Sequence, residues 1–221
     1  MTDQLLKDAF LEQIEEIDYP CVMAKSALLS GNIHTIIAEA FCPAPFHARE
    51  VLADIYAAID VIEDKPGYHS IAVLFRQPAM MSEAEYDEVF WPYLQSLHML
   101  DSAQYGWNEN VSSDPSSKNF SFSLKGEAFY VIGMHNKSSR KARVTSMPAI
   151  IFNPHRQFDA LREKGKYTKI RDTIRERDAA YAGSPNPMLQ DFGEASEVFQ
   201  YTGTKLDKEN WTCPFKPQTQ A

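Results

Sequence analysis

His98 and His135 are the side chains of this sequence best suited to bind a metal ion. His98 lies in a segment with helical periodicity, where Leu94 and Leu97 occupy adjoining positions, so its imidazole is expected to face the protein interior. A neutral, buried imidazole is a good axial ligand for haem iron. The alternative is a core histidine that hydrogen-bonds to a backbone carbonyl, because buried polar groups usually find such a partner.

His135 ends an apolar run over residues 129–135, and a basic segment that holds Arg140 and Arg143 follows it. An imidazole at a strand end with two guanidinium groups close behind predicts a metal site beside a carboxylate or phosphate site. The alternative is a strand end followed by a solvated basic loop. His155 is predicted instead to begin the next helix.

Asp191, Glu194 and Glu197 could together bind a cation. They are spaced three residues apart, so in a helix they would line one side and could accept a guanidinium or ammonium group. Alternatively, they are acids near a helix N-terminus that complement the helix dipole. The sequence has no Gly-x-Ser-x-Gly, P-loop, His-Glu-x-x-His or Gly-x-Gly-x-x-Gly motif, so hydrolase, kinase and dinucleotide-binding functions lack support.

The composition is that of an ordinary globular chain with an acidic balance. Its 221 residues fit one domain, spanning residues 1–221. The net charge of −8 argues against non-specific binding to nucleic acid or to an anionic membrane surface. No stretch reaches about 18 apolar residues, so we expect no membrane span and a cytoplasmic protein. Cys21, Cys42 and Cys213 lie far apart without zinc spacing, which favours reduced thiols.

Hydrophobic periodicity and turn signals predict an α+β domain whose mixed or antiparallel sheet has flanking helices. A capping box formed by Ser82 and Glu85 should open the third helix, and Pro92 should kink it. The tail at residues 211–215 is bulky and apolar, so we expect it to dock on the body of the protein. Predicted helices cover residues 4–17, 48–62, 82–100 and 158–181 (interrupted at Gly165), with a short one near 194. Predicted strands cover residues 69–75, 120–124, 128–135 and 149–152. Residues 22–41 are predicted to form a β-hairpin that turns at Ser30-Gly31-Asn32.

Many short strings of this sequence resemble, in the same order, those of the YqcI/YcgG family, over nearly the whole chain. Characterised members are haem proteins that hydroxylate a guanidine nitrogen of arginine or of an arginine-derived compound. The resemblance therefore implies haem b, dioxygen or peroxide, an electron donor and a cationic guanidino substrate. The strings include Tyr-Pro-Cys at 19–21 with Ala-x-Ser-Ala at 24–27, Gly-x-His-x-x-Ser-x-Arg at 133–140, Asn-Pro-His at 153–155, Gly-Glu-x-Ser-Glu at 193–197 and Trp-x-Cys-Pro-Phe at 211–215.

The resemblance, combined with the residue chemistry, assigns roles to the candidate side chains. His98 is the preferred iron ligand, because a helix face holds an imidazole firmly; His135 is second, and a Cys213 thiolate is the alternative. Arg140 and Arg143 are expected to bind the haem propionates, with Arg175 and Arg177 next. Phe90, Trp91, Phe129 and Val131 are the expected walls of the haem slot.

The substrate cation is expected at Glu194 and Glu197, with Asp191 third. Two other functions fit the same sequence: a haem sensor or carrier without turnover, and a haem-free module that binds a small molecule. The sequence leaves open whether the chain forms a homodimer.

Overall fold

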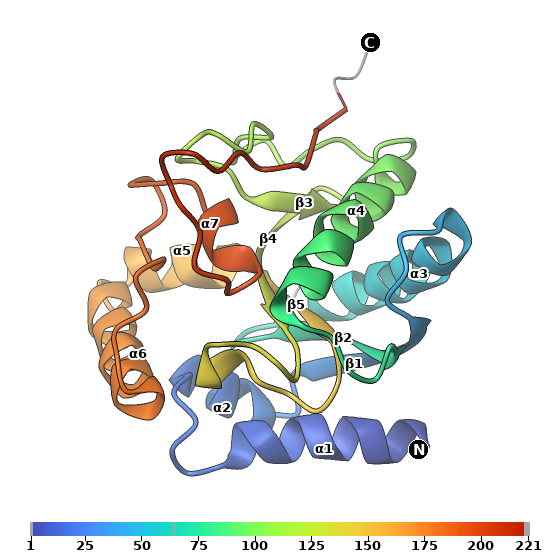
Figure 1. Cartoon of the computed structure of the whole chain (residues 1–221). Helices are drawn as coiled ribbons and strands as arrows, with labels where there is room; N and C mark the ends of the chain where they lie inside the picture. Colours follow the sequence, from blue (N-terminus) through green and yellow to red (C-terminus); the bar gives the residue numbers. More distant parts are fainter. Residues whose placement is uncertain (1, 64, 219–221) are drawn as a thin grey trace.

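A mixed sheet lies at the centre of the computed structural model, which describes residues 2–63 and 65–218 (Figure 1). Within those residues five strands run in the order β1-β2-β5-β4-β3. β1 pairs with β2 in parallel, and the other pairs are antiparallel. The predicted α+β class and mixed sheet are therefore confirmed. The strands are β1 (Ile33–Ala40), β2 (Ser70–Gln77), β3 (Phe122–Leu124), β4 (Glu127–Met134) and β5 (Ala149–Pro154).

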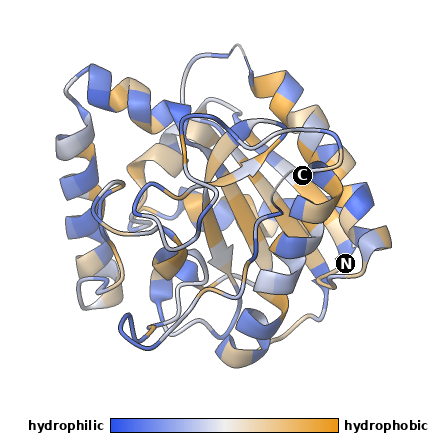
Figure 2. Ribbon diagram, turned by 90° about the horizontal axis from the view of Figure 1, so that it is seen from above, coloured by the Kyte–Doolittle hydropathy of each residue, from blue (hydrophilic) through white to orange (hydrophobic). Residues whose placement is uncertain are grey.

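Helices cover both faces of the sheet, because successive strand residues point to opposite sides. From β2, Val73 and Phe75 join one core with α3 and α4, whereas Ala72 and Leu74 join a second core with α1. Figure 2 shows the hydrophobic residues concentrated on the central strands. The helices are α1 (Asp3–Glu15), α2 (Val22–Leu29), α3 (Pro45–Ile62), α4 (Glu83–Asp101), α5 (Arg156–Glu163), α6 (Tyr167–Ala182) and α7 (Val198–Tyr201).

The hairpin predicted for residues 22–41 is wrong, because its first half is the helix α2. The turn signal marks the end of that helix rather than a hairpin loop. The N–H of Ser30 donates to the carbonyl of Ser26, and Gly31 has a φ of +67°, a conformation that only glycine adopts without strain. The chain then enters β1, which pairs in parallel with β2 after the crossover helix α3.

The predicted beginning of α4 and the docked tail are confirmed. Ser82 and Glu85 form both hydrogen bonds of the capping box. Pro92 lies inside α4, which is a single helical segment from Glu83 to Asp101. In the tail, the Trp211 ring packs 5.7 Å from the Trp91 ring, and Phe215 is 1% exposed. Among the described residues, no helix is both long enough and apolar enough to cross a membrane.

Candidate functional site

Two adjoining cavities lie between the sheet, α2, α6 and the segment that precedes α7. The first, which we call the histidine lobe, has a volume of about 130 Å³ and includes His155 in its wall. The second, the cysteine lobe, has about 230 Å³ and includes Cys21. Together they reach the lower end of the range of about 300–1,000 Å³ typical of small-molecule sites. Both lobes are lined by Met23, Tyr130, Phe158, Ile174 and Leu189.

The break between α5 and α6 brings residues of both helices into the wall of the histidine lobe. Gly165 has a φ of +62°, which lets the chain turn sharply, so that α6 crosses over the lobes instead of continuing α5. Asp178 is the buried residue of α6, while Ile170 and Ile174 are half-buried and line the histidine lobe. α6 therefore covers the site with few apolar anchors of its own.

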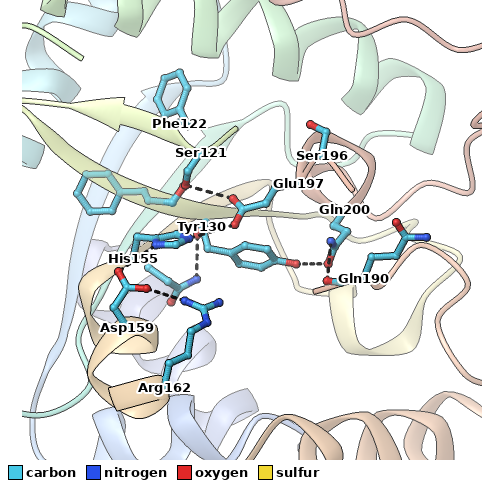
Figure 3. Close-up of polar contacts among 12 residues, drawn as sticks. Ser121, Phe122, Tyr130, His155, Asp159, Arg162, Gln190, Ser196, Glu197 and Gln200 are labelled. Atoms are coloured by element: carbon cyan, nitrogen blue, oxygen red, sulfur yellow. Dashed lines mark hydrogen bonds and ion pairs between the residues drawn. The ribbon is translucent and has the colours of Figure 1, made fainter. Parts of the chain in front are cut away.

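His155 lies between two carboxylates at the wall of the histidine lobe (Figure 3). As predicted, it is the residue at which α5 begins. Its Nε2 is 3.4 Å from Oε1 of Glu197, and its Nδ1 is 3.4 Å from Oδ2 of Asp159. Glu197 also accepts hydrogen bonds from the hydroxyls of Ser121, at 3.2 Å, and Tyr201, at 3.3 Å. The two ends of the imidazole are thus both fixed by acids.

This arrangement favours the imidazolium form of His155. Burial alone would lower the pKa of His155, but the hydrogen bonds with Asp159 and Glu197, together with their negative charge, outweigh it and raise the pKa to about 9. Burial raises the pKa of Glu197, whereas its hydrogen bonds with His155, Ser121 and Tyr201 act in the opposite direction. Because Glu197 is only 3% exposed, its charge is tolerable only beside such a cation.

The remaining wall of the histidine lobe combines aromatic rings with arginines. The Tyr130 hydroxyl donates to Gln200, whose amide nitrogen donates in turn to the carbonyl of Gln190 at 3.3 Å. Arg171 and Arg175 also line the lobe, and their side chains are 25% and 36% exposed. The wall of the lobe therefore includes both a buried acid and partly exposed guanidinium groups.

Of the three acids predicted to bind a cation, the structure places only Glu197 in the wall of a lobe. Asp191 pairs with Arg171 and Arg175, so its charge is already neutralised. Glu194 is exposed, and its carboxylate accepts a hydrogen bond from the backbone of Asp191 at 3.4 Å. The predicted shared helix face is wrong, because residues 183–197 are not helical and α7 begins only at Val198.

His98 is buried, as predicted, but it faces the core beneath the tail rather than either lobe. Its ring lies 5.3 Å from the rings of Trp107 and Phe215, and its Nε2 accepts a hydrogen bond from the backbone of Gln218 at 2.9 Å. Burial lowers the pKa of His98, so the ring is neutral. The expected wall residues Phe90 and Trp91 are packed in the same core.

His135 is fully buried and stacks on Tyr86, with the ring centroids 4.6 Å apart. Its Nδ1 accepts a hydrogen bond from the backbone of Lys137 at 3.3 Å, and burial lowers its pKa. The ring does not line either lobe. Cys213 is also in the core, where burial raises the pKa of its thiol to about 12 and so opposes a thiolate.

Arg140 and Arg143 both line the cysteine lobe, but their guanidinium groups have partners within the protein. Arg140 pairs with Asp178 and donates to the carbonyl of Ser184 at 3.0 Å, which leaves its buried Nε without a partner. The guanidinium of Arg143 donates to the backbone carbonyls of Gly133, Gln200 and Tyr201, at 3.1, 2.8 and 3.2 Å.

The other two predicted arginines are both on α6, but their side chains have different surroundings. Arg175 lines the histidine lobe, whereas Arg177 donates to the backbone carbonyls of Ile17 and Tyr19, both at 3.0 Å. The residues that sequence reasoning missed are His155 and Tyr130 in the histidine lobe and Cys21 in the cysteine lobe. The Tyr-Pro-Cys and Asn-Pro-His strings were the signals that contained Cys21 and His155.

Comparison with known proteins gives a single consistent relationship. The sequence model of the YqcI/YcgG family matches residues 10–216. The uncharacterized protein YqcI of Bacillus subtilis (strain 168) is 26% identical over 211 residues, which cover 91% of this chain and 82% of that protein. No solved structure matches.

Proposed function

The chain belongs to the YqcI/YcgG family, and on that premise we propose that it is a cytoplasmic oxygenase that uses haem to hydroxylate a guanidine nitrogen of arginine or a related compound. The observation that carries the proposal is the carboxylate of Glu197, buried at the wall of the histidine lobe. A guanidinium stays protonated at neutral pH and presents a planar fork of N–H donors, so its site needs carboxylate oxygens.

The charges around the histidine lobe also fit a substrate that carries a carboxylate. Arg171 and Arg175 share Asp191 as a partner, and their side chains are partly exposed, so both can accept a further anionic group. An amino acid with a guanidino side chain would then direct its cation to Glu197 and its carboxylate to the two arginines. Arginine has this distribution of charge.

Within this proposal, His155 keeps Glu197 ionised before the substrate arrives. The imidazolium neutralises the buried carboxylate in the free protein, and a bound guanidinium would take over part of that role. The aromatic rings of Tyr130 and Phe158 would then exclude water from the bound guanidino group.

Haem, when bound, would supply the activation of dioxygen: one oxygen atom enters the N–H bond, and the other leaves as water with two electrons from a donor and two protons from solvent. Neither predicted histidine fits this role in the present arrangement, because His98 and His135 both face the core and not a lobe. That observation favours a second candidate function, a haem-free module that binds the guanidino compound without turnover.

Isothermal titration calorimetry with arginine tests the guanidino site without depending on haem. Glu197→Gln should weaken binding by more than tenfold, because removing a carboxylate from a desolvated cation typically costs about 2–5 kcal/mol. Citrulline, which has the shape of arginine but an uncharged ureido group, should not bind measurably to the unmodified protein.

Glu194→Gln is the matched control, because it neutralises an exposed carboxylate outside the lobe and should leave the affinity unchanged. Equal arginine affinities in the unmodified protein and both variants would place the cation elsewhere. Equal binding of arginine and citrulline would contradict recognition by charge.

A further inference from the structure

The wall of the cysteine lobe carries more positive than negative charge. Of the described residues, those with an ionised side chain in this wall are Arg140, Arg143 and Asp178. All three are buried, with 8%, 7% and 7% of their surfaces exposed. Arg140 and Asp178 form an ion pair, so their two charges neutralise each other. The positive charge of Arg143 is left over.

Arg143 is held by hydrogen bonds to groups that carry no net charge. Its guanidinium donates to the backbone carbonyls of Gly133, Gln200 and Tyr201. Buried charges in proteins are usually paired, because taking an isolated ion out of water is costly. Since Arg143 lines the cysteine lobe, an anion that enters the lobe would lower this cost.

An unsatisfied donor in the same wall is independent evidence for a ligand. Within residues 2–63 and 65–218, the buried Nε of Arg140 has no hydrogen-bond partner, although Asp178 and the carbonyl of Ser184 hold the rest of its guanidinium. Buried N–H groups without a partner are rare, because they forgo the hydrogen bonds that water would supply. This N–H can therefore donate to an oxygen atom of a molecule in the lobe.

The rest of the cysteine lobe is small and mostly apolar, which sets the kind of molecule that it can enclose. Its walls include Phe10, Ile14, Ile132, Met134 and Ile151, against which a hydrocarbon group would pack. The volume is about 230 Å³. A water molecule occupies about 30 Å³ in the liquid, so the lobe suits a ligand of about eight non-hydrogen atoms.

We propose that the cysteine lobe binds a small monocarboxylic acid with an apolar body. Its carboxylate accepts a hydrogen bond from Nε of Arg140 and balances the charge of Arg143, and the apolar walls enclose its hydrocarbon chain. One negative charge is what the wall lacks. This site is separate from the guanidino site at Glu197, which does not line the cysteine lobe, and it does not depend on the reaction proposed above.

Isothermal titration calorimetry of the full chain with hexanoate, a carboxylate of the size that fits the lobe, tests the proposal. Hexanamide is the matched ligand, because it has the same shape without the charge. It should bind at least tenfold more weakly than hexanoate. Equal affinities for the two ligands, or no heat of binding with millimolar hexanoate, would overturn the proposal.

Two substitutions in the wall should change the hexanoate affinity in opposite directions. Asp178→Asn removes the negative charge and keeps a side-chain oxygen for Arg140, so hexanoate should bind at least threefold more tightly. Arg140→Met removes the Nε donor and a positive charge, so the affinity should fall more than tenfold. Glu176→Gln, which neutralises an exposed acid of α6 outside the lobe, is the control for overall charge. Weaker binding in Asp178→Asn than in Glu176→Gln, as expected of a purely structural role, contradicts the proposal.

Protection of Cys21 from alkylation locates the ligand without any substitution. Cys21 and Cys42 are both half-buried, but only Cys21 lines the cysteine lobe. In the unmodified protein, saturating hexanoate should slow the reaction of Cys21 with iodoacetamide at least fivefold and leave Cys42 unchanged, as followed by mass spectrometry. Equal labelling of Cys21 with and without hexanoate overturns the assignment to this lobe, even if a variant fails to fold.

Discussion

The imidazolium of His155 should make the stability of this protein fall as the pH rises toward about 9. The pKa of His155 is raised from 6.5 to about 9 in the folded protein, because its hydrogen bonds and charge contacts with Asp159 and Glu197 outweigh burial. A raised pKa means that the folded state holds the proton more tightly than the unfolded state. The resulting stabilisation is complete below pH 6.5 and is lost as the pH rises through about 9.

The size of the effect follows from the same shift. Each unit of pKa difference corresponds to about 1.4 kcal/mol, so His155 should contribute about 3 kcal/mol at pH 6 that is absent at pH 10. Urea unfolding, followed by tryptophan fluorescence at intervals from pH 6 to pH 10, gives the free energy of unfolding at each pH.

Replacement of His155 by Gln isolates this contribution from other titrations. The pKa values of His98 and His135 are lowered by burial, so those residues change the stability only as the pH falls below about 6.5. Burial raises the pKa of the Cys21 thiol, so this group changes the free energy of unfolding only above about pH 8.5. It does so equally in the unmodified protein and in His155→Gln. The difference between the unmodified protein and His155→Gln should therefore shrink by about 3 kcal/mol between pH 6.5 and 9. Parallel pH curves over that interval would refute the assignment of an imidazolium to this site.

Two substitutions elsewhere test the packing and hydrogen bonding of the protein interior. Gly133→Ala should lower the free energy of unfolding by about 1–3 kcal/mol, because the added Cβ would lie 2.8 Å from the Tyr86 hydroxyl; Gly106→Ala, with open space around it, is the control. Arg143→Met should lower it by about 3 kcal/mol or more, since three backbone carbonyl oxygens lose their donor. The exposed Arg49→Met should have little effect, and guanidinium chloride unfolding measures all four variants; an Arg143→Met loss no larger than that of Arg49→Met contradicts the second prediction.

The sequence predicted the elements whose periodicity is long or strongly marked. α3 and α4 repeat apolar residues over 18 and 19 residues, and a capping box marks the beginning of α4. α2 has only 8 residues and is apolar on several sides, so its periodicity does not distinguish a helix from a strand. The Ser-Gly-Asn signal after it is compatible with either a hairpin loop or a helix end, and tertiary packing decides between them.

The candidate site was predictable only in part, because its residues meet through the fold. Glu197 was expected to bind a cation on the basis of helical spacing with Asp191 and Glu194, yet it reaches the lobe without that helix. Its partner His155 lies far away in the sequence at the end of β5, and no local pattern joins the two. Cys21 stands in a recognisable string, but only the three-dimensional arrangement shows that a cavity and a buried arginine face it.

The docked tail has a consequence for the order in which the protein folds during synthesis. The backbone of Gln218 bonds to the imidazole of His98, and these residues are 120 positions apart. At synthesis rates of about 5–20 residues per second, the end of α4 would wait on the order of 10 seconds for its cover. During that time the aromatic rings that later enclose Phe215 are exposed to water and to other chains. A nascent chain therefore offers this end of α4 to a chaperone until the segment that reaches Gln218 has been made.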